Sequence, residues 1–151
     1  MSDEEKTVNL IIASHGGMAE ATLRSAEQIV GPVESAQVVT MSFSMNLDDL
    51  EKEFRTAISN LNEDEGIMIL VDLFGGSCSN VAARLYKEFS EKGRKFAVLA
   101  GFNLPMVVEF ACSTQRGDLL QITEKISTAG QNACINVGNK LDALAAKKIT
   151  K

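Results

Sequence analysis

The fold and the first candidate site meet in one stretch, Val8–Gly17, which reads VNLIIASHGG. Its first six residues are almost entirely apolar, as expected for a strand covered on both faces of a parallel sheet. Its last four place His15, the chain's single histidine, at the carboxyl end of that strand. Ligands of open α/β sheets bind at this edge, and imidazole exchanges protons near neutral pH. His15 is therefore a candidate functional residue, although its position alone does not separate chemistry from structure.

Four apolar runs predict strands, and the segments between them predict helices. The runs are Thr7–Ala13, Gln37–Phe43, Ile67–Asp72 and Phe96–Gly101. The second run is less uniformly apolar, which places it nearer an edge. Repeated β-α units of this length favour one doubly wound, mainly parallel α/β domain spanning residues 1–151, with a core of about 7–145. The expected strand order is 2-1-3-4, in which the winding reverses between strands 1 and 3.

Apolar residues recur at helical spacing between and after these runs. The stripes are Ala19–Val30, Leu47–Leu61, Val81–Phe89 and, for one long last helix, Ile126–Leu144. Asn46 suits the N-cap of the second helix, and Pro105 suits the first turn of another helix, with Asn103 just upstream. Asp118–Thr123 is a candidate for a short additional strand.

Composition excludes several classes of function. The net charge is −5 and there is no basic stripe, which argues against nucleic-acid binding. The longest apolar stretches fall far short of the ~20 residues that a membrane span needs, and the acidic segment 1–6 lacks the basic start of a signal peptide. Three cysteines without a Cys-x-x-Cys pair indicate a reducing compartment, so we expect a cytoplasmic location. One histidine and scattered thiols disfavour a zinc site.

A second strand end supplies an acidic partner for His15. Residues 71–77 read VDLFGGS, so Asp72 follows the third strand and a glycine turn comes next. Neighbouring strands lie roughly 4.8 Å apart, so Asp72 can accept a hydrogen bond from one ring nitrogen and leave the other as a directed nucleophile. Gly75, Gly76 and Ser77 can bring backbone and hydroxyl donors to a phosphoryl group. Each element taken alone is more often a simple turn or cap.

Three blocks carry a resemblance to a known family. They are Ile11–Gly16 (IIASHG), Leu70–Ser77 (LVDLFGGS) and Ala100–Met106 (AGFNLPM). In these blocks, their order and their spacing, the chain resembles the enzyme IIA component of the mannose-family phosphoenolpyruvate:sugar phosphotransferase system, the mannose/fructose/sorbose type. The second and third blocks together are specific, whereas the histidine block alone is weakly so.

The resemblance implies a phosphoryl carrier. His15 would accept a phosphoryl group from the phosphocarrier HPr and pass it to a IIB component, with Asp72 orienting the ring. The phosphoryl oxygens would be held by Phe74, Gly75, Gly76 and Ser77. The scheme requires no metal or cofactor, and it implies a homodimer that exchanges a C-terminal strand, for which Asp118–Thr123 is the candidate here. Because the chain shows no Ala/Pro-rich linker, we expect the IIB component on a separate chain, itself bound to the membrane permease IIC/IID.

The chain departs from the family pattern at two positions beside the candidate site. Leu73 and Cys78 stand where family members often carry Thr and Pro, so a hydroxyl contact from position 73 is not carried over. An apolar rim that excludes water is expected around the histidine, with core packing as the alternative for each member. The rim candidates are Met18, Phe74, Phe102 and Met106.

Other functions stay open at this stage. A IIA-like phosphohistidine subunit that serves dihydroxyacetone kinase shares the architecture, although the glycines after His15 and the 72–77 block fit the sugar system better. A non-catalytic anion-binding module would hold its ligand without His15. A receiver-like regulator phosphorylated on Asp72 would need an acidic pair near the end of the first strand, which residues 14–17 do not provide. The sequence does not reveal the sugar.

Overall fold

A computed structural model describes residues 7–113 and 118–149, and its centre is one four-stranded sheet. The strands are β1 (Asn9–His15), β2 (Ala36–Met41), β3 (Ile67–Val71) and β4 (Phe96–Ala100). All pairs are parallel and the order is β2-β1-β3-β4, which confirms the predicted topology. β2 lies at an edge as expected, and each strand begins and ends within two residues of its predicted bounds.

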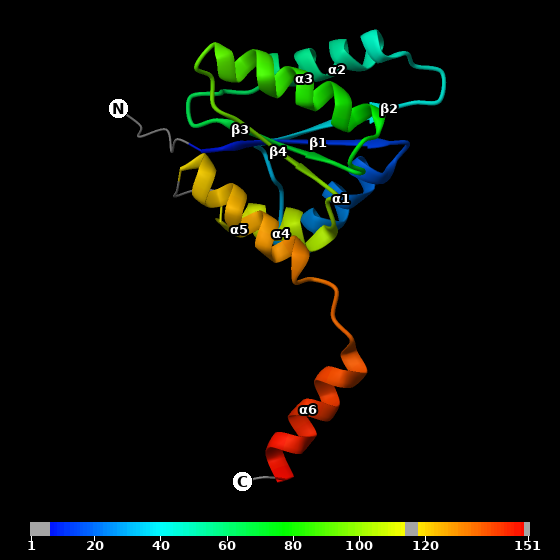
Figure 1. Cartoon of the computed structure of the whole chain (residues 1–151), viewed down its shortest axis with the longest axis vertical. Coiled ribbons are helices and arrows are strands. Elements are labelled where there is room, and N and C mark those ends of the chain that lie inside the picture. The colour runs from blue at the N-terminus through cyan, green and yellow to red at the C-terminus, as the bar shows by residue number, and fades with distance from the viewer. Residues whose placement is uncertain (1–6, 114–117, 150–151) are drawn as a thin grey trace.

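Helices cover both faces of this sheet (Figure 1). They are α1 (Met18–Val30), α2 (Leu47–Ser59), α3 (Ser77–Glu91), α4 (Leu104–Ser113), α5 (Leu119–Gln131) and α6 (Val137–Ile149). α2 and α3 lie on one face, whereas α1, α4 and α5 lie on the other, and α6 projects away from the body. The arrangement is a doubly wound α/β fold, as predicted.

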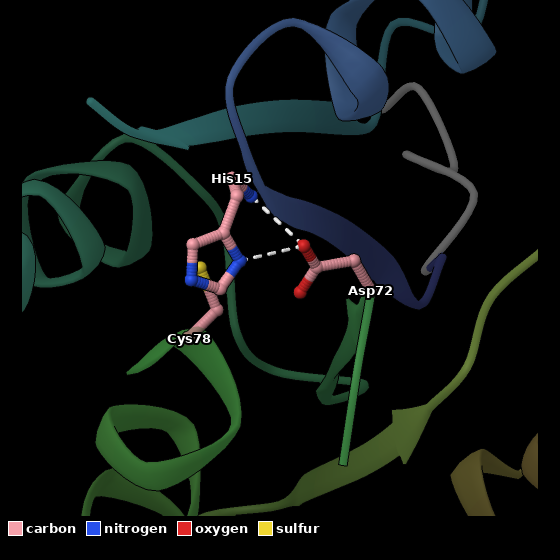
Figure 2. Close-up of side chains that lie close together, drawn as sticks. All are labelled: His15, Asp72 and Cys78. Atoms are coloured by element: carbon pink, nitrogen blue, oxygen red, sulfur yellow. Dashed lines mark hydrogen bonds and ion pairs between the residues drawn. The ribbon is translucent and has the colours of Figure 1, made fainter. Parts of the chain in front are cut away.

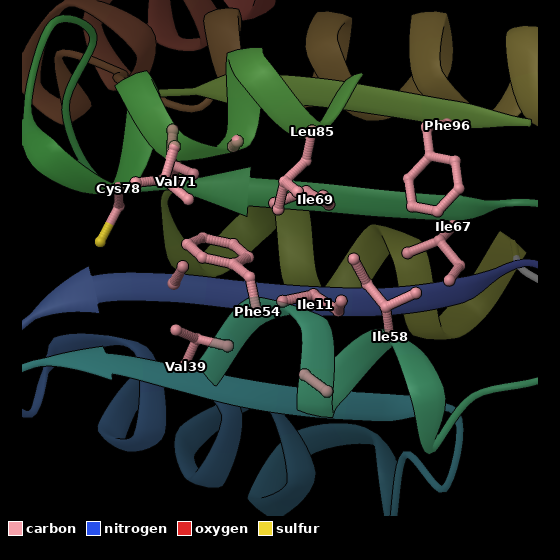
Figure 3. Close-up of a cluster of buried hydrophobic side chains, with 14 of the residues drawn as sticks. Ile11, Val39, Phe54, Ile58, Ile67, Ile69, Val71, Cys78, Leu85 and Phe96 are labelled. Carbon is pink, nitrogen blue, oxygen red and sulfur yellow. The ribbon is translucent and has the colours of Figure 1, made fainter. Parts of the chain in front are cut away.

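Alternating side chains of the central strands build two separate cores. Ile11 of β1 packs with α2 and α3, whereas its neighbours Leu10 and Ile12 pack with α1, α4 and α5. Figure 3 shows the first core, where Phe54 and Leu85 reach the sheet from α2 and α3. A fully buried side chain of this size stabilises the fold by about 1.5–3 kcal/mol. Burial on both faces therefore fixes β1 beside β3 and places their carboxyl ends together.

Side-chain caps set the start of two helices where the sequence predicts them. Asn46 accepts a hydrogen bond from the backbone N–H of Asp49 at 2.8 Å, at the start of α2. Asn103 accepts one from the N–H of Met106 at 3.2 Å, which closes the first turn of α4 around Pro105. Each cap satisfies a backbone donor that the helix itself leaves unpaired.

The predictions for the C-terminal third are wrong in two places. Asp118–Thr123 forms no strand, because Asp118 caps α5 by accepting from the N–H of Gln121 at 2.8 Å. Ile122 and Ile126, four residues apart, then bury one helical face. The single long last helix is two helices: α5 ends at Gln131, and Asn136 starts α6 by accepting from the N–H of Asn139 at 2.9 Å.

The structure tests the prediction of no membrane span, but not the prediction of no signal peptide. Across 7–113 and 118–149, no helix has both the length and the apolar character needed to cross a bilayer. The acidic segment 1–6, on which the prediction of no signal peptide rests, lies outside the described residues, as do 114–117 and 150–151.

Candidate functional site

His15 and Asp72 meet at the carboxyl edge of the two central strands (Figure 2). His15 is the last residue of β1 and Asp72 directly follows β3, which pairs with β1 through Ala13 and Val71. The backbone N–H of His15 donates to Oδ2 of Asp72 at 2.9 Å, and Nδ1 of the ring lies 2.8 Å from the same oxygen. One carboxylate thus holds both the backbone and the ring of the histidine. Because Nδ1 is engaged, Nε2 is the nitrogen left for chemistry.

Exposure differs between the two partners. The His15 side chain is 48% exposed, whereas that of Asp72 is 11% exposed. Burial by itself would raise the pKa of Asp72, but the hydrogen bonds from the His15 backbone and ring outweigh it and hold that pKa below its usual range. Asp72 therefore stays ionised beside the ring and can stabilise positive charge that develops on it.

The glycine turn after β3 packs directly against the imidazole. Gly75 has a φ of +84°, a backbone conformation that residues with a side chain rarely adopt. A Cβ on Gly76 would lie 3.2 Å from Cε1 of His15 and 3.3 Å from the carbonyl oxygen of Leu73. The N–H of Gly76 donates to that same carbonyl at 3.1 Å. A side chain at position 76 would therefore force the ring or the turn to shift.

An open cleft of about 600 Å³ lies beside His15. It is lined by His15, Gly16, Gly17, Thr40, Met41, Ser42, Phe43 and Ser77. Of the turn predicted to hold phosphate, Ser77 alone is among these lining residues, and it opens α3, whose start carries no side-chain cap. Segment 40–43 is missed by the sequence reasoning. The predicted strand order 2-1-3-4 could have identified this segment, because it places the end of β2 beside the end of β1.

The apolar side chains near the site divide into exposed and buried groups. Met18 and Phe74 are exposed, as a rim requires, and Phe43 beside the cleft is fully exposed. Phe102 and Met106 are each 4% exposed and belong to the core with α1, α4 and α5. For these two residues the core alternative is correct.

Cys78 is the third side chain at the histidine. It is the second residue of α3, its side chain is fully buried, and its sulfur lies within 4.8 Å of ligand atoms of His15 and Asp72. Burial raises the pKa of this thiol to about 12, and the neighbouring Asp72 carboxylate adds to the effect. The thiol is therefore protonated at neutral pH, which disfavours Cys78 as a nucleophile.

The third sequence block, residues 100–106, makes its contacts with α5 rather than with His15. Besides capping α4, Asn103 donates through Nδ2 to the carbonyl of Gly130 in α5 at 3.1 Å. A Cβ on Gly130 would lie 2.5 Å from the sulfur of Met106, so α4 and α5 touch closely here. Asn103 and Met106 thus join two helices, and this part of the motif is structural.

The site can now be set beside known proteins. A model of the family described as "PTS system fructose IIA component" matches residues 9–129. The mannose-specific EIIAB component of Escherichia coli (strain K12) is 31% identical over 103 residues, which is 68% of this chain but 31% of that protein. The fructose-specific EIIA component of Bacillus subtilis (strain 168) is 28% identical over 102 residues, 68% of this chain and 67% of that one.

Solved structures show the same likeness. The mannose/sorbose-specific IIA subunit from Enterococcus faecalis superposes with a TM-score of 0.78 at 29% identity, covering 87% of this chain and 96% of that one. The phosphotransferase system component EIIA from Streptococcus agalactiae has a TM-score of 0.78 at 26% identity, covering 87% and 98%.

Proposed function

This chain belongs to the fructose/mannose IIA family of the sugar phosphotransferase system, and within that family we propose that His15 is the residue that carries the phosphoryl group. One observation carries the proposal: Nδ1 of His15 lies 2.8 Å from Oδ2 of Asp72, at an edge where the ring is half exposed. This contact fixes the ring and leaves Nε2 available to react with a phosphorylated protein partner.

The transfer needs positioning more than covalent help. Nε2 of His15 attacks the phosphorus of a donor phosphohistidine, the donor N–P bond breaks, and a new N–P bond forms on Nε2. Nδ1–H keeps donating to Asp72, whose negative charge stabilises the positive charge that the ring gains. The same steps in reverse order deliver the group to the next acceptor.

The turn at Phe74, Gly75, Gly76 and Ser77 is our proposed cradle for the phosphoryl oxygens. Ser77 offers a hydroxyl in the His15 cleft, and the uncapped first turn of α3 offers backbone N–H groups with a favourable dipole. The N–H of Gly76 is already bound to Leu73, so its role is to let the turn approach the ring.

Docking of protein partners is supported by the apolar side chains around the cleft. Met18, Phe43, Leu73 and Phe74 are all exposed, and they follow β1, β2 and β3 at the carboxyl edge of the sheet. Exposed apolar side chains that gather at one place mark interaction sites. We assign HPr as the donor and a IIB component as the acceptor, with the permease IIC/IID reached through IIB, which places the chain in the cytoplasm.

We further propose a homodimer through the β4 edge. Among the residues that the structure describes, β4 pairs with β3 only, and beside it an apolar hollow of about 540 Å³ includes Tyr86, Phe96 and Leu120. α6 has Val137, Leu141 and Leu144 exposed along one face. A 13-residue helix is marginal in water without packing, so a second copy is our proposed cover for α6 and this edge.

Incubation with phosphoenolpyruvate, enzyme I and HPr tests the carrier role. Intact mass should show one acid-labile phosphoryl group on the wild type and none on His15→Ala, with unchanged circular dichroism. Asp72→Asn should accept the group about 10²–10³-fold more slowly, the range for losing one preorganised group that stabilises developing charge. A wild type that gains no mass would reject the HPr-dependent role, and Asp72→Asn at the normal rate would remove Asp72 from the mechanism.

A further inference from the structure

The site brings together three different metal-binding atom types. A ring nitrogen of His15, a carboxylate oxygen of Asp72 and the Cys78 sulfur all lie within 4.8 Å of one another. Figure 2 shows the three side chains meeting at the imidazole, each supplied by a different part of the chain: the end of β1, the residue after β3 and the first turn of α3. The phosphoryl-transfer steps above use the first two and leave the thiol without a role.

Two features indicate more than proximity. Oδ1 of Asp72 is buried and meets no hydrogen-bond partner among the described residues, although Oδ2 is fully used. An unpaired buried carboxylate oxygen is costly unless a cation or donor can reach it. Cys78 is fully buried, yet its sulfur lies beside a half-exposed imidazole rather than among apolar groups alone. Of the three residues His15 lines the open cleft, and its side chain is half exposed, so solvent reaches the group at the imidazole.

We propose that His15, Asp72 and Cys78 bind a divalent ion of the zinc class when the histidine carries no phosphoryl group. Zinc takes nitrogen, oxygen and thiolate ligands together, and three protein ligands leave one position open. Ligands of one tetrahedral zinc lie about 3.5 Å apart, so pairs near the 4.8 Å limit must close by roughly 1 Å through rotation of the three side chains. The thiol loses its proton to solvent as the sulfur–metal bond forms.

Metal binding and phosphoryl acceptance exclude each other in this geometry. A metal on Nε2 occupies the nitrogen that attacks phosphorus, and a metal on Nδ1 displaces the hydrogen bond to Asp72. Zinc is thus a reversible inhibitor of the unphosphorylated protein. This consequence rests on the proposed function, whereas the binding itself does not.

The binding test uses Co²⁺, because a thiolate ligand gives it a charge-transfer absorption in the near ultraviolet. The starting protein is the full chain with Cys112→Ser and Cys134→Ser, which removes the two exposed thiols and leaves Cys78. Co²⁺ should produce the band, Zn²⁺ should abolish it by displacement, and Cys78→Ala or Cys78→Ser should lack it. His15→Ala and Asp72→Asn should each weaken Co²⁺ binding at least tenfold.

The outcomes separate this inference from the proposed function. No band in the starting protein, or a band of equal affinity in His15→Ala and Asp72→Asn, would overturn the three-ligand site. Where HPr phosphorylates the wild type, added Zn²⁺ should slow acceptance at least tenfold and a chelator should restore it. Unchanged acceptance at a Zn²⁺ concentration that saturates binding would overturn the competition. A wild type that HPr never phosphorylates would instead reject the carrier role while leaving the spectroscopic result standing.

Discussion

Two regions of this molecule expose apolar side chains, and they do so in different ways. At the carboxyl edge of β1 and β3, Met18, Phe43 and Phe74 lie on, or directly after, the loops around the hydrogen-bonded His15–Asp72 pair. At the other region, the exposed apolar side chains belong to helices: Leu120 of α5 beside β4, and Val137, Leu141 and Leu144 along one face of α6. Loops around a reactive side chain suit partners that come and go, whereas an unpaired strand edge and an amphipathic helix need lasting cover.

The largest expected effect breaks the second region without touching the first. Leu141→Glu with Leu144→Glu puts two charges on the apolar face of α6. Each leucine that the proposed dimer buries is worth about 1.5–3 kcal/mol and both copies change, so that dimer should weaken by more than about a thousandfold. Sedimentation equilibrium should therefore find a monomer. Phosphoryl acceptance should persist, because His15 and Asp72 come from the same chain.

The matched control places the same charges on the opposite side of α6. Asn139→Glu with Ala143→Glu lies about half a helical turn from Leu141 and Leu144. This variant should sediment like the wild type. If both double variants dissociate equally, the apolar face is not the contact; if neither does, α6 plays no part in assembly.

A smaller effect is expected from disturbing the first region alone. In Gly76→Val the side chain would meet Cε1 of His15, since even a Cβ comes within 3.2 Å. A ring displaced by about 1 Å should lower the rate of phosphoryl acceptance about a hundredfold. Single-turnover phosphorylation by phospho-HPr measures that rate, and sedimentation should show the dimer intact.

Gly17→Ala serves as the contrast for Gly76→Val. Nothing lies within 4 Å of a Cβ built on Gly17, and its φ of −84° suits any residue. Acceptance by this variant should stay within a few-fold of the wild type. Equal losses in both variants would mean that the loops matter for docking rather than for holding the ring.

The same contrast explains what could be predicted from sequence. The His15–Asp72 contact could be predicted from the sequence, because each residue ends an apolar run and the strand order follows from a general rule of parallel sheets. The contact of Cys78 with the His15–Asp72 pair could not be predicted, because its distance from the ring depends on how α3 leaves the glycine turn. Segment 40–43 was overlooked although the strand order placed it nearby.

The C-terminal errors have a different cause. The stripe from Ile126 to Leu144 keeps helical spacing across the break, so periodicity could not locate the end of α5 at Gln131. Leu119 and Ile122 also suit a strand, and the cap at Asp118 decided in favour of a helix. Both residues depend on packing against α4 and β4, and that tertiary context is absent from a local pattern.

The smallest expected effect tests how the His15–Asp72 pair contributes to stability. Because the folded pKa of Asp72 lies below its ordinary 3.8, its stabilisation is complete above that pH and is lost as the pH falls through the folded pKa. The free energy of unfolding of the wild type should exceed that of Asp72→Asn by about 1.5 kcal/mol at neutral pH, the low end of the range for hydrogen bonds to a charged group, because His15 is half exposed. Urea unfolding between pH 7 and 2.5 should show this gap closing in acid.

In His15→Ala the backbone N–H still donates to Asp72, so part of the pH dependence should remain. A gap that widens in acid would mean that burial outweighs both hydrogen bonds, and the carboxylate would then be a poor partner for a charged ring.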